Sequence, residues 1–179
     1  GNLSQLRYIY ASATISNSQE IVRKISNRQD NLTIINQSGA HKAQTTFISL
    51  KPQNSILHTA AQIAAMLVTK DVVGICFCDS REMVKALAQA IRKILAEEQL
   101  SHLQNTISAF YANLRNSQRR KIIADIKSGS IKFIVSTSAL EAGLDLGCID
   151  AVLICGYPGS ILSFRQRAGR AGRKDEGLV

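Results

Sequence analysis

Short runs of apolar and β-branched residues alternate along this chain with longer segments in which apolar residues recur at helical spacing. The short runs predict strands at Leu6–Tyr10, Thr46–Leu50, Val72–Cys78, Ile107–Tyr111, Phe133–Ser136 and Ala151–Cys155. The longer segments predict helices at His58–Leu67, Arg81–Glu98 and Ser117–Lys127. Such alternation is typical of βαβ units, so we expect an α/β fold with a mostly parallel sheet that helices cover on both faces.

Polar residues follow three of the predicted strands directly. These loop segments are Asp79-Ser80-Arg81, Tyr111-Ala112-Asn113 and Ser136-Thr137-Ser138. In a doubly wound sheet, ligand-binding loops gather at the carboxyl ends of the strands. We therefore expect the three segments to line one polar cleft.

The balance of charge favours a polyanionic partner. The 179 residues include 22 Lys and Arg against 13 Asp and Glu, which gives a net charge of +9. The basic residues cluster between Arg115 and Lys121 and between Arg165 and Lys174. No apolar run reaches membrane-spanning length and no signal peptide opens the chain, so we expect a cytoplasmic protein without a membrane partner.

The cysteines and histidines show no metal-binding spacing. Cys76, Cys78 and Cys155 lie in apolar, strand-like runs, and no two of the four cysteines have C-x-x-C spacing. We interpret these three as small buried hydrophobic residues in a reducing compartment, and we expect neither a metal site nor a disulfide.

The segment from Gln166 to Arg173 reads Q-R-A-G-R-A-G-R. On a helix, Gln166, Arg170 and Arg173 would share one face, with apolar Phe164, Ala168 and Ala171 opposite. Paired guanidinium groups suit a polyphosphate, because each offers several donors and keeps its charge. The glycines at 169 and 172 would weaken a helix, which indicates that something approaches the backbone closely there.

The segment from Ser136 to Gly147 is a second candidate for phosphate binding. Small hydroxyl residues at a strand end can bind a phosphate through side chain and backbone N–H together. Gly143 permits close backbone approach, and Asp145 is suited to accept a hydrogen bond from a sugar hydroxyl.

Together these segments resemble the motifs of superfamily 2 helicases, in the order that this family has them. The arginine segment resembles the final motif, Q-x-x-G-R-x-G-R, which makes Arg170 and Arg173 arginine fingers of ATP hydrolysis and brings Gln166 to the ATP. The segment from Ser136 resembles motif V, in which Gly143 and Asp145 lie beside the nucleotide and Thr137, with neighbouring Ser138, contacts the nucleic-acid backbone. The resemblance implies a RecA-like P-loop NTPase-type three-layer α/β/α sandwich.

Two more resemblances imply further contacts with nucleic acid. Gly74 to Arg81 resembles motif IV, with Ser80 and Arg81 at its polar end, although a plain helix cap and a surface arginine explain these two residues as well. Asn113 and the helix start that carries Arg119 and Arg120 resemble the segment between motifs IV and V. A solvated helix face is the alternative for the two arginines.

Near the start of the chain, Ser12-Ala13-Thr14 resembles motif III, which couples ATP hydrolysis to strand separation. The segment from Ala139 to Arg173 is similar to the MrfA-like DNA repair helicases. Ala142 stands where many RNA-unwinding DEAD-box proteins have arginine, which favours DNA over RNA as the partner.

The chain contains only half of the residues that a helicase needs for an ATP-hydrolysing active site. It contains no G-K dipeptide of a P-loop, and Asp175-Glu176, its Asp-Glu pair, does not end an apolar strand. We therefore expect residues 1–30 to be the end of a first motor domain and residues 31–179 to be the second RecA-like domain. ATP and Mg²⁺ would be bound mainly by the absent first domain of the same polypeptide, and this chain alone would be inactive.

Three alternatives remain at the level of the sequence. A non-enzymatic nucleic-acid-binding module explains the charge and the missing P-loop, and a double-strand translocase that does not unwind explains the motifs. A dinucleotide-binding enzyme fits poorly, because G-R-A-G lacks the full G-x-G-x-x-G pattern.

The predicted strand at Leu6–Tyr10 would be separated from the rest of its sheet. Its apolar side would then lack a partner, which predicts non-native self-association of the chain.

Overall fold

The computed structural model describes residues 8–12, 17–27, 32–35, 44–141, 146–147, 149–172 and 176–179. The chain divides into two compact units, Gly1–His41 and Lys42–Val179. The predicted boundary after residue 30 falls inside the first unit. The assignment of that segment to a first motor domain stays a prediction.

The first unit contains one described helix, α1 (Ser18–Ser26), which ends at Asn27 in a left-handed conformation. None of the α1 residues is buried. The predicted strand at Leu6–Tyr10 is wrong for residues 8–10, which have no regular secondary structure and are exposed; its first two residues lie outside the described part. A strand needs a neighbour for its backbone hydrogen bonds, and Tyr8 to Tyr10 are not part of the six-stranded sheet. Self-association through this segment stays a prediction.

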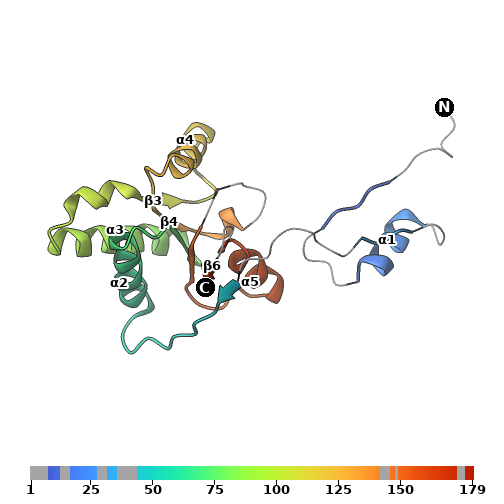
Figure 1. Cartoon of the computed structure of the whole chain (residues 1–179), viewed down its shortest axis with the longest axis horizontal. Coiled ribbons are helices and arrows are strands. Elements are labelled where there is room, and N and C mark those ends of the chain that lie inside the picture. The colour runs from blue at the N-terminus through green and yellow to red at the C-terminus, as the bar shows by residue number, and fades with distance from the viewer. Residues whose placement is uncertain are drawn as a thin grey trace. The chain divides into compact units, whose positions relative to one another are not determined.

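The second unit is built on a six-stranded sheet whose pairings are all parallel (Figure 1). Its strands are β1 (Gln44–Thr46), β2 (Gly74–Phe77), β3 (Ile107–Phe110), β4 (Phe133–Ser136), β5 (Ala151–Ile154) and β6 (Glu176–Leu178), in the order β1-β6-β5-β2-β4-β3. The predicted parallel sheet is therefore confirmed, with β6 as a strand that the sequence analysis did not find.

Helices cover both faces of this sheet. They are α2 (Ile56–Thr69), α3 (Arg81–Glu97), α4 (Asn116–Lys127) and α5 (Ile161–Ala168), with short 3₁₀ helices η2 (Ser101–Thr106) and η3 (Ser138–Leu140). Cys76 and Phe133 pack with α2 and α3 on one face, whereas Ile75 and Phe77 pack with α4 on the other. This alternation follows from the period of two in a strand, and it confirms the three-layer α/β/α arrangement. Among the described helices, none has the length and apolar composition needed to cross a bilayer.

The predicted strand Thr46–Leu50 is wrong beyond its first residue. The observed strand β1 ends at Thr46, although the Ile48 N–H still donates to the Val179 carbonyl at 2.7 Å. Strand β1 is at the sheet edge, and it pairs with β6 from Gln44 opposite Glu176 to Thr46 opposite Leu178.

Phe133 fills the centre of the sheet face covered by α2 and α3. Its ring carbons would lie 2.5 Å from a Cβ atom placed on Gly74, and its side chain has no exposed surface. We expect Phe133→Ala to lower the free energy of unfolding by about 3–5 kcal/mol because it leaves a cavity. The measurement is urea unfolding of this chain. Phe47→Ala, at an exposed phenylalanine, is the matched control, and an equal loss in the two variants would contradict the expectation.

Candidate functional site

Four loops follow β2, β3, β4 and β5 at one edge of the sheet, as parallel topology requires. Backbone hydrogen bonds continue between them beyond the strands. The Cys78 N–H donates to the Ser136 carbonyl at 2.8 Å, and the Cys155 N–H donates to the Phe77 carbonyl at 3.0 Å. The Thr137 N–H donates to the Phe110 carbonyl at 3.3 Å. The three predicted loop segments, after β2, β3 and β4, therefore do gather at one edge, and the polar cleft that they would line stays a prediction.

Helix α5 carries the first part of the arginine segment. Ser160 caps its start, with Oγ accepting from the Ser163 N–H at 3.0 Å. The helix ends at Ala168, so the prediction of one helical face that holds Gln166, Arg170 and Arg173 is wrong for Arg170; Arg173 lies outside the described residues. The Arg170 N–H bonds back to the Arg167 carbonyl three residues earlier, at 3.1 Å, which tightens the chain into a turn.

The glycines of this segment serve a close approach, which is made by the chain itself. Gly172 has a φ of +75°, and its N–H donates to the Ile149 carbonyl at 3.0 Å. A Cβ atom on Gly177 of β6 would lie 2.6 Å from the Gly172 nitrogen. The turn that carries Arg170 is therefore pressed against β6 at Gly172, whereas a Cβ atom on Gly169 would lie 3.0 Å from the Arg165 carbonyl oxygen.

Glu141, in the loop after β4, holds the arginine segment in place. Its Oε1 accepts from Arg167 Nε at 2.7 Å and from Ser163 Oγ at 2.9 Å. Its backbone carbonyl accepts from Arg170 Nη2 at 2.8 Å. Arg167 and Arg170 are only 5% and 7% exposed, so these contacts lie away from bulk water. One acidic residue thus joins the start of the motif V segment to the arginine segment.

Arg167 combines three further features. Its guanidinium carbon lies 5.4 Å from the centre of the Phe77 ring, and Nη1 lies 4.0 Å from Asp79 Oδ1. Nη1 is buried and has no hydrogen-bond partner among the residues that the structure describes. A buried donor without a partner is costly. Arg167 is thus enclosed between the Phe77 ring, Asp79 and Glu141.

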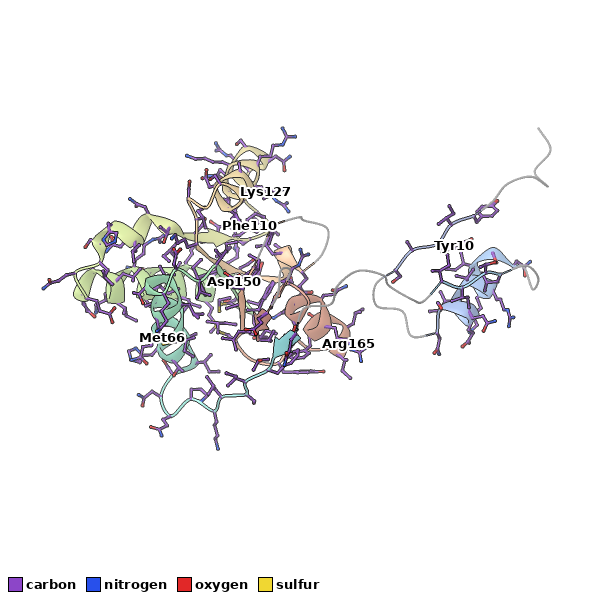
Figure 2. All side chains as sticks on the ribbon, in the orientation of Figure 1. Tyr10, Met66, Phe110, Lys127, Asp150 and Arg165 are labelled. Atoms are coloured by element: carbon purple, nitrogen blue, oxygen red, sulfur yellow. The ribbon has the colours of Figure 1, made fainter. Side chains whose placement is uncertain are left out.

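The predicted nucleic-acid residues lie on the same edge of the sheet. Ser80 caps α3 by accepting from the Met83 N–H at 3.1 Å, as expected, and Arg81 is exposed beside it. Asn113 is exposed after β3. The Arg119 guanidinium lies 5.4 Å from the centre of the Phe110 ring, which Figure 2 labels at the sheet beneath α4.

The loop after β4 contributes the remaining two predicted nucleic-acid contacts. Thr137 Oγ1 accepts from the Ala139 N–H at 3.5 Å, a long bond that caps η3, and the side chain is half-buried. Ser138 is exposed at the first position of η3.

Of the remaining predicted site residues, two are described and five are not. Ser12 is described and exposed in the first unit, and Gln166 is half-buried on α5. The others lie outside the described residues: Ala13, Thr14, Gly143, Asp145 and Arg173. Sequence reasoning missed Glu141, Ser163 and Arg167. One usable signal was that the arginine segment contains no acid, while the Ser136–Gly147 segment that precedes it contains two, Glu141 and Asp145.

Three thiols also lie together near this edge. Cys76, Cys78 and Cys155 are buried, as predicted, but their sulfur atoms all lie within 4.8 Å of one another. Hydrogen bonds from Cys76 and Cys78 lower the pKa of the Cys155 thiol, and the bond to Cys155 raises the pKa of Cys76 and that of Cys78. The separation of Cys155 from the other two along the chain hid this cluster from the sequence analysis.

Comparison with known proteins gives the same family as the motifs. The family described as "Helicase conserved C-terminal domain" matches residues 58–175. The chain is 30% identical over 97% of its length to the ATP-dependent helicase hrq1 of Schizosaccharomyces pombe, of which it covers 17%.

Solved structures of helicases support the same family assignment. The DUF1998 helicase MrfA bound to DNA has a TM-score of 0.79 and 30% identity, over 93% of this chain and 23% of that one. The Mycobacterium smegmatis helicase Lhr bound to ssDNA and AMP-PNP has a TM-score of 0.75 and 28% identity, over the same shares. The chain thus spans about a fifth of these relatives. With its RecA-like fold, it belongs to the helicase conserved C-terminal domain family, as the second motor domain of a superfamily 2 helicase related to MrfA, Lhr and Hrq1.

Proposed function

We propose that the full-length protein is an ATP-driven DNA helicase in which this domain supplies arginine fingers and contacts to backbone phosphates. ATP and Mg²⁺ are held mainly by a first RecA-like domain of the same polypeptide, and this chain alone hydrolyses no ATP. The proposal is supported by hrq1, an ATP-dependent helicase, and by MrfA and Lhr, whose structures contain DNA.

The observation that carries the proposal is the set of bonds made by Glu141. The loop after β4 holds Thr137 and Ser138 as nucleic-acid contacts, and it also contains Glu141, which binds Arg167 and Arg170. Movement of this loop on the nucleic acid therefore reaches the arginine segment through three short bonds. This provides a physical route between strand binding and ATP hydrolysis.

Arg170 and Arg173 are the proposed arginine fingers. ATP supplies a γ-phosphoryl group whose oxygens become more negative as it is transferred, and guanidinium groups stabilise that charge. The Glu141 carbonyl fixes one nitrogen of Arg170, so its side chain is already ordered before the domains close. Gln166, Gly143 and Asp145 would bind the nucleotide beside them.

Nucleic acid would bind across Ser80, Arg81, Asn113, Arg119, Thr137 and Ser138. These residues lie on or next to three loops at one edge of the sheet, and they include two arginines and several uncharged hydrogen-bonding groups. Such a set suits phosphates and sugars more than base edges, so we expect binding with little sequence preference. Ser12, Ala13 and Thr14 would couple hydrolysis to strand separation.

The first test concerns the arginine fingers of the full-length protein. We expect Arg170→Ala and Arg173→Ala each to reduce DNA-stimulated ATP turnover by at least about 10³-fold, because a finger acts on the transition state. Nucleotide and DNA binding should change little. Arg165→Ala, at an exposed arginine of α5, is the control.

Normal turnover in both finger variants would refute that assignment. Strand displacement measured beside ATP turnover on the intact protein separates the remaining alternatives. Turnover without displacement favours a double-strand translocase, and DNA binding without turnover favours a binding module.

Glu141 is proposed as a positioning residue. Glu141→Ala leaves the buried Arg167 without its carboxylate, and we expect the free energy of unfolding of this chain to fall by about 3–5 kcal/mol. Glu141→Gln keeps an oxygen acceptor and should lose less. Ser163→Ala, which removes one neutral donor to the same oxygen, should cost about 1 kcal/mol. The free energy of unfolding is measured by urea unfolding. Equal losses in Glu141→Ala and Ser163→Ala would show that the ion pair between Glu141 and Arg167 contributes nothing to stability.

The nucleic-acid surface gives a salt-dependence prediction. Arg81→Ala and Arg119→Ala in the full-length protein should each weaken single-stranded DNA binding similarly for unrelated sequences, and each should reduce the slope of log K against log salt by about 0.7. Lys93→Ala, which removes an exposed charge near the other end of α3, is the control. An unchanged slope in an arginine variant would exclude that arginine from phosphate contact.

A further inference from the structure

Three cysteine side chains from two separate strands meet in the core of the second unit. Cys76 and Cys78 are two residues apart, so they lie on the same face of the chain through β2. Strands β2 and β5 are parallel neighbours, with Phe77 opposite Ile154, so the next step along each brings Cys78 beside Cys155. The three residues are 0%, 1% and 6% exposed, respectively.

The distances between the sulfur atoms suit one small metal ion. All three lie within 4.8 Å of one another, and Cys76 Sγ is 3.5 Å from Cys155 Sγ. A tetrahedral ion with metal–sulfur bonds of about 2.3 Å requires sulfur atoms about 3.8 Å apart, which lies within this range. Rotamer adjustments of a fraction of an ångström therefore close the site around an ion.

The surroundings favour metal binding at this position. The cluster lies against the apolar core formed with α2 and α3, where unpaired thiolates would be costly and a bound cation offsets their charge. Cys78 is followed by the exposed Asp79, and Cys155 is followed by the exposed Gly156. A Cβ atom on Gly156 would lie 3.3 Å from Asp79 Oδ2, so the two strand exits lie together at the surface. A carboxylate and exposed backbone therefore follow the thiols directly in sequence.

We propose that Cys76, Cys78 and Cys155 bind a single thiophilic cation, with Zn²⁺ the best match. Zn²⁺ prefers thiolate ligands in tetrahedral geometry, and a water molecule or the carboxylate of Asp79, which follows Cys78 directly, would complete its fourth position. The proposal replaces the expectation of three inert hydrophobic cysteines. It stands independently of the motor function, because none of the three sulfurs belongs to the helicase motifs' proposed contacts.

Cobalt provides the direct test on this 179-residue chain, purified with a phosphine reductant and freed of metal with a chelator. One equivalent of Co²⁺ should produce thiolate-to-cobalt charge-transfer absorption and the intense visible bands of a tetrahedral site. One equivalent of Zn²⁺ should remove both signals. Absence of the charge-transfer band, with all thiols shown to be reduced by a thiol count in denaturant, would overturn the proposal.

Variants assign the site to the three sulfurs. Cys155→Ala should weaken Zn²⁺ binding at least about tenfold in competition with a chelator, and Cys76→Ala should do the same. Cys148→Ala removes the fourth cysteine of the chain, which lies outside the described residues, and should leave binding unchanged. Wild-type affinity in Cys155→Ala would overturn the proposal.

A second readout avoids dependence on the variants' folding. Zn²⁺ should raise the unfolding temperature of the wild-type chain because it binds the folded state. It should also slow alkylation of Cys76, Cys78 and Cys155, counted by mass spectrometry. An unchanged unfolding temperature together with unchanged alkylation would overturn the proposal, as would a Cys76–Cys155 disulfide that persists under the reductant. Failure of the motor proposal would leave these results unaltered.

Discussion

The buried ion pair between Arg167 and Glu141 is the interaction on which the site depends. A guanidinium group that is almost completely removed from water requires a carboxylate partner, and Glu141 supplies one at 2.7 Å. The same residue then accepts bonds from Ser163 and Arg170. Because these partners belong to segments on either side of β5, the pair fixes two motif segments relative to each other. The loop after β4 and the turn after α5 therefore have one common anchor.

The sheet itself was accessible to sequence reasoning because local patterns determine it. Phe133–Ser136 was predicted with its observed bounds, and α3 and α4 were predicted within one residue at each end. Ser80 was recognisable as a cap because a hydroxyl residue precedes a long helical period. Errors arose away from the central strands, at β1 on the sheet edge and at residues 8–10, which have no regular secondary structure.

The site was less accessible, because it depends on contacts between distant residues. Arg170 was placed on a helix by its spacing from Gln166, whereas packing of Gly172 against Gly177 and the bond to Ile149 turn the chain instead. The three cysteines meet because β5 lies next to β2, an order that the succession of strands along the chain does not reveal. Residue types thus predicted the chemistry of the edge, and the fold determined which of those residues touch.

The contact between Gly172 and β6 has a mechanical consequence. Strand β6 lies between β5 and β1, and Val179 exchanges backbone bonds with Thr46 and Ile48. Because neither Gly172 nor Gly177 carries a side chain, the backbone of the arginine segment packs directly on β6. A larger residue at Gly177 would therefore displace the turn that carries Arg170, and with it the position of a positive charge.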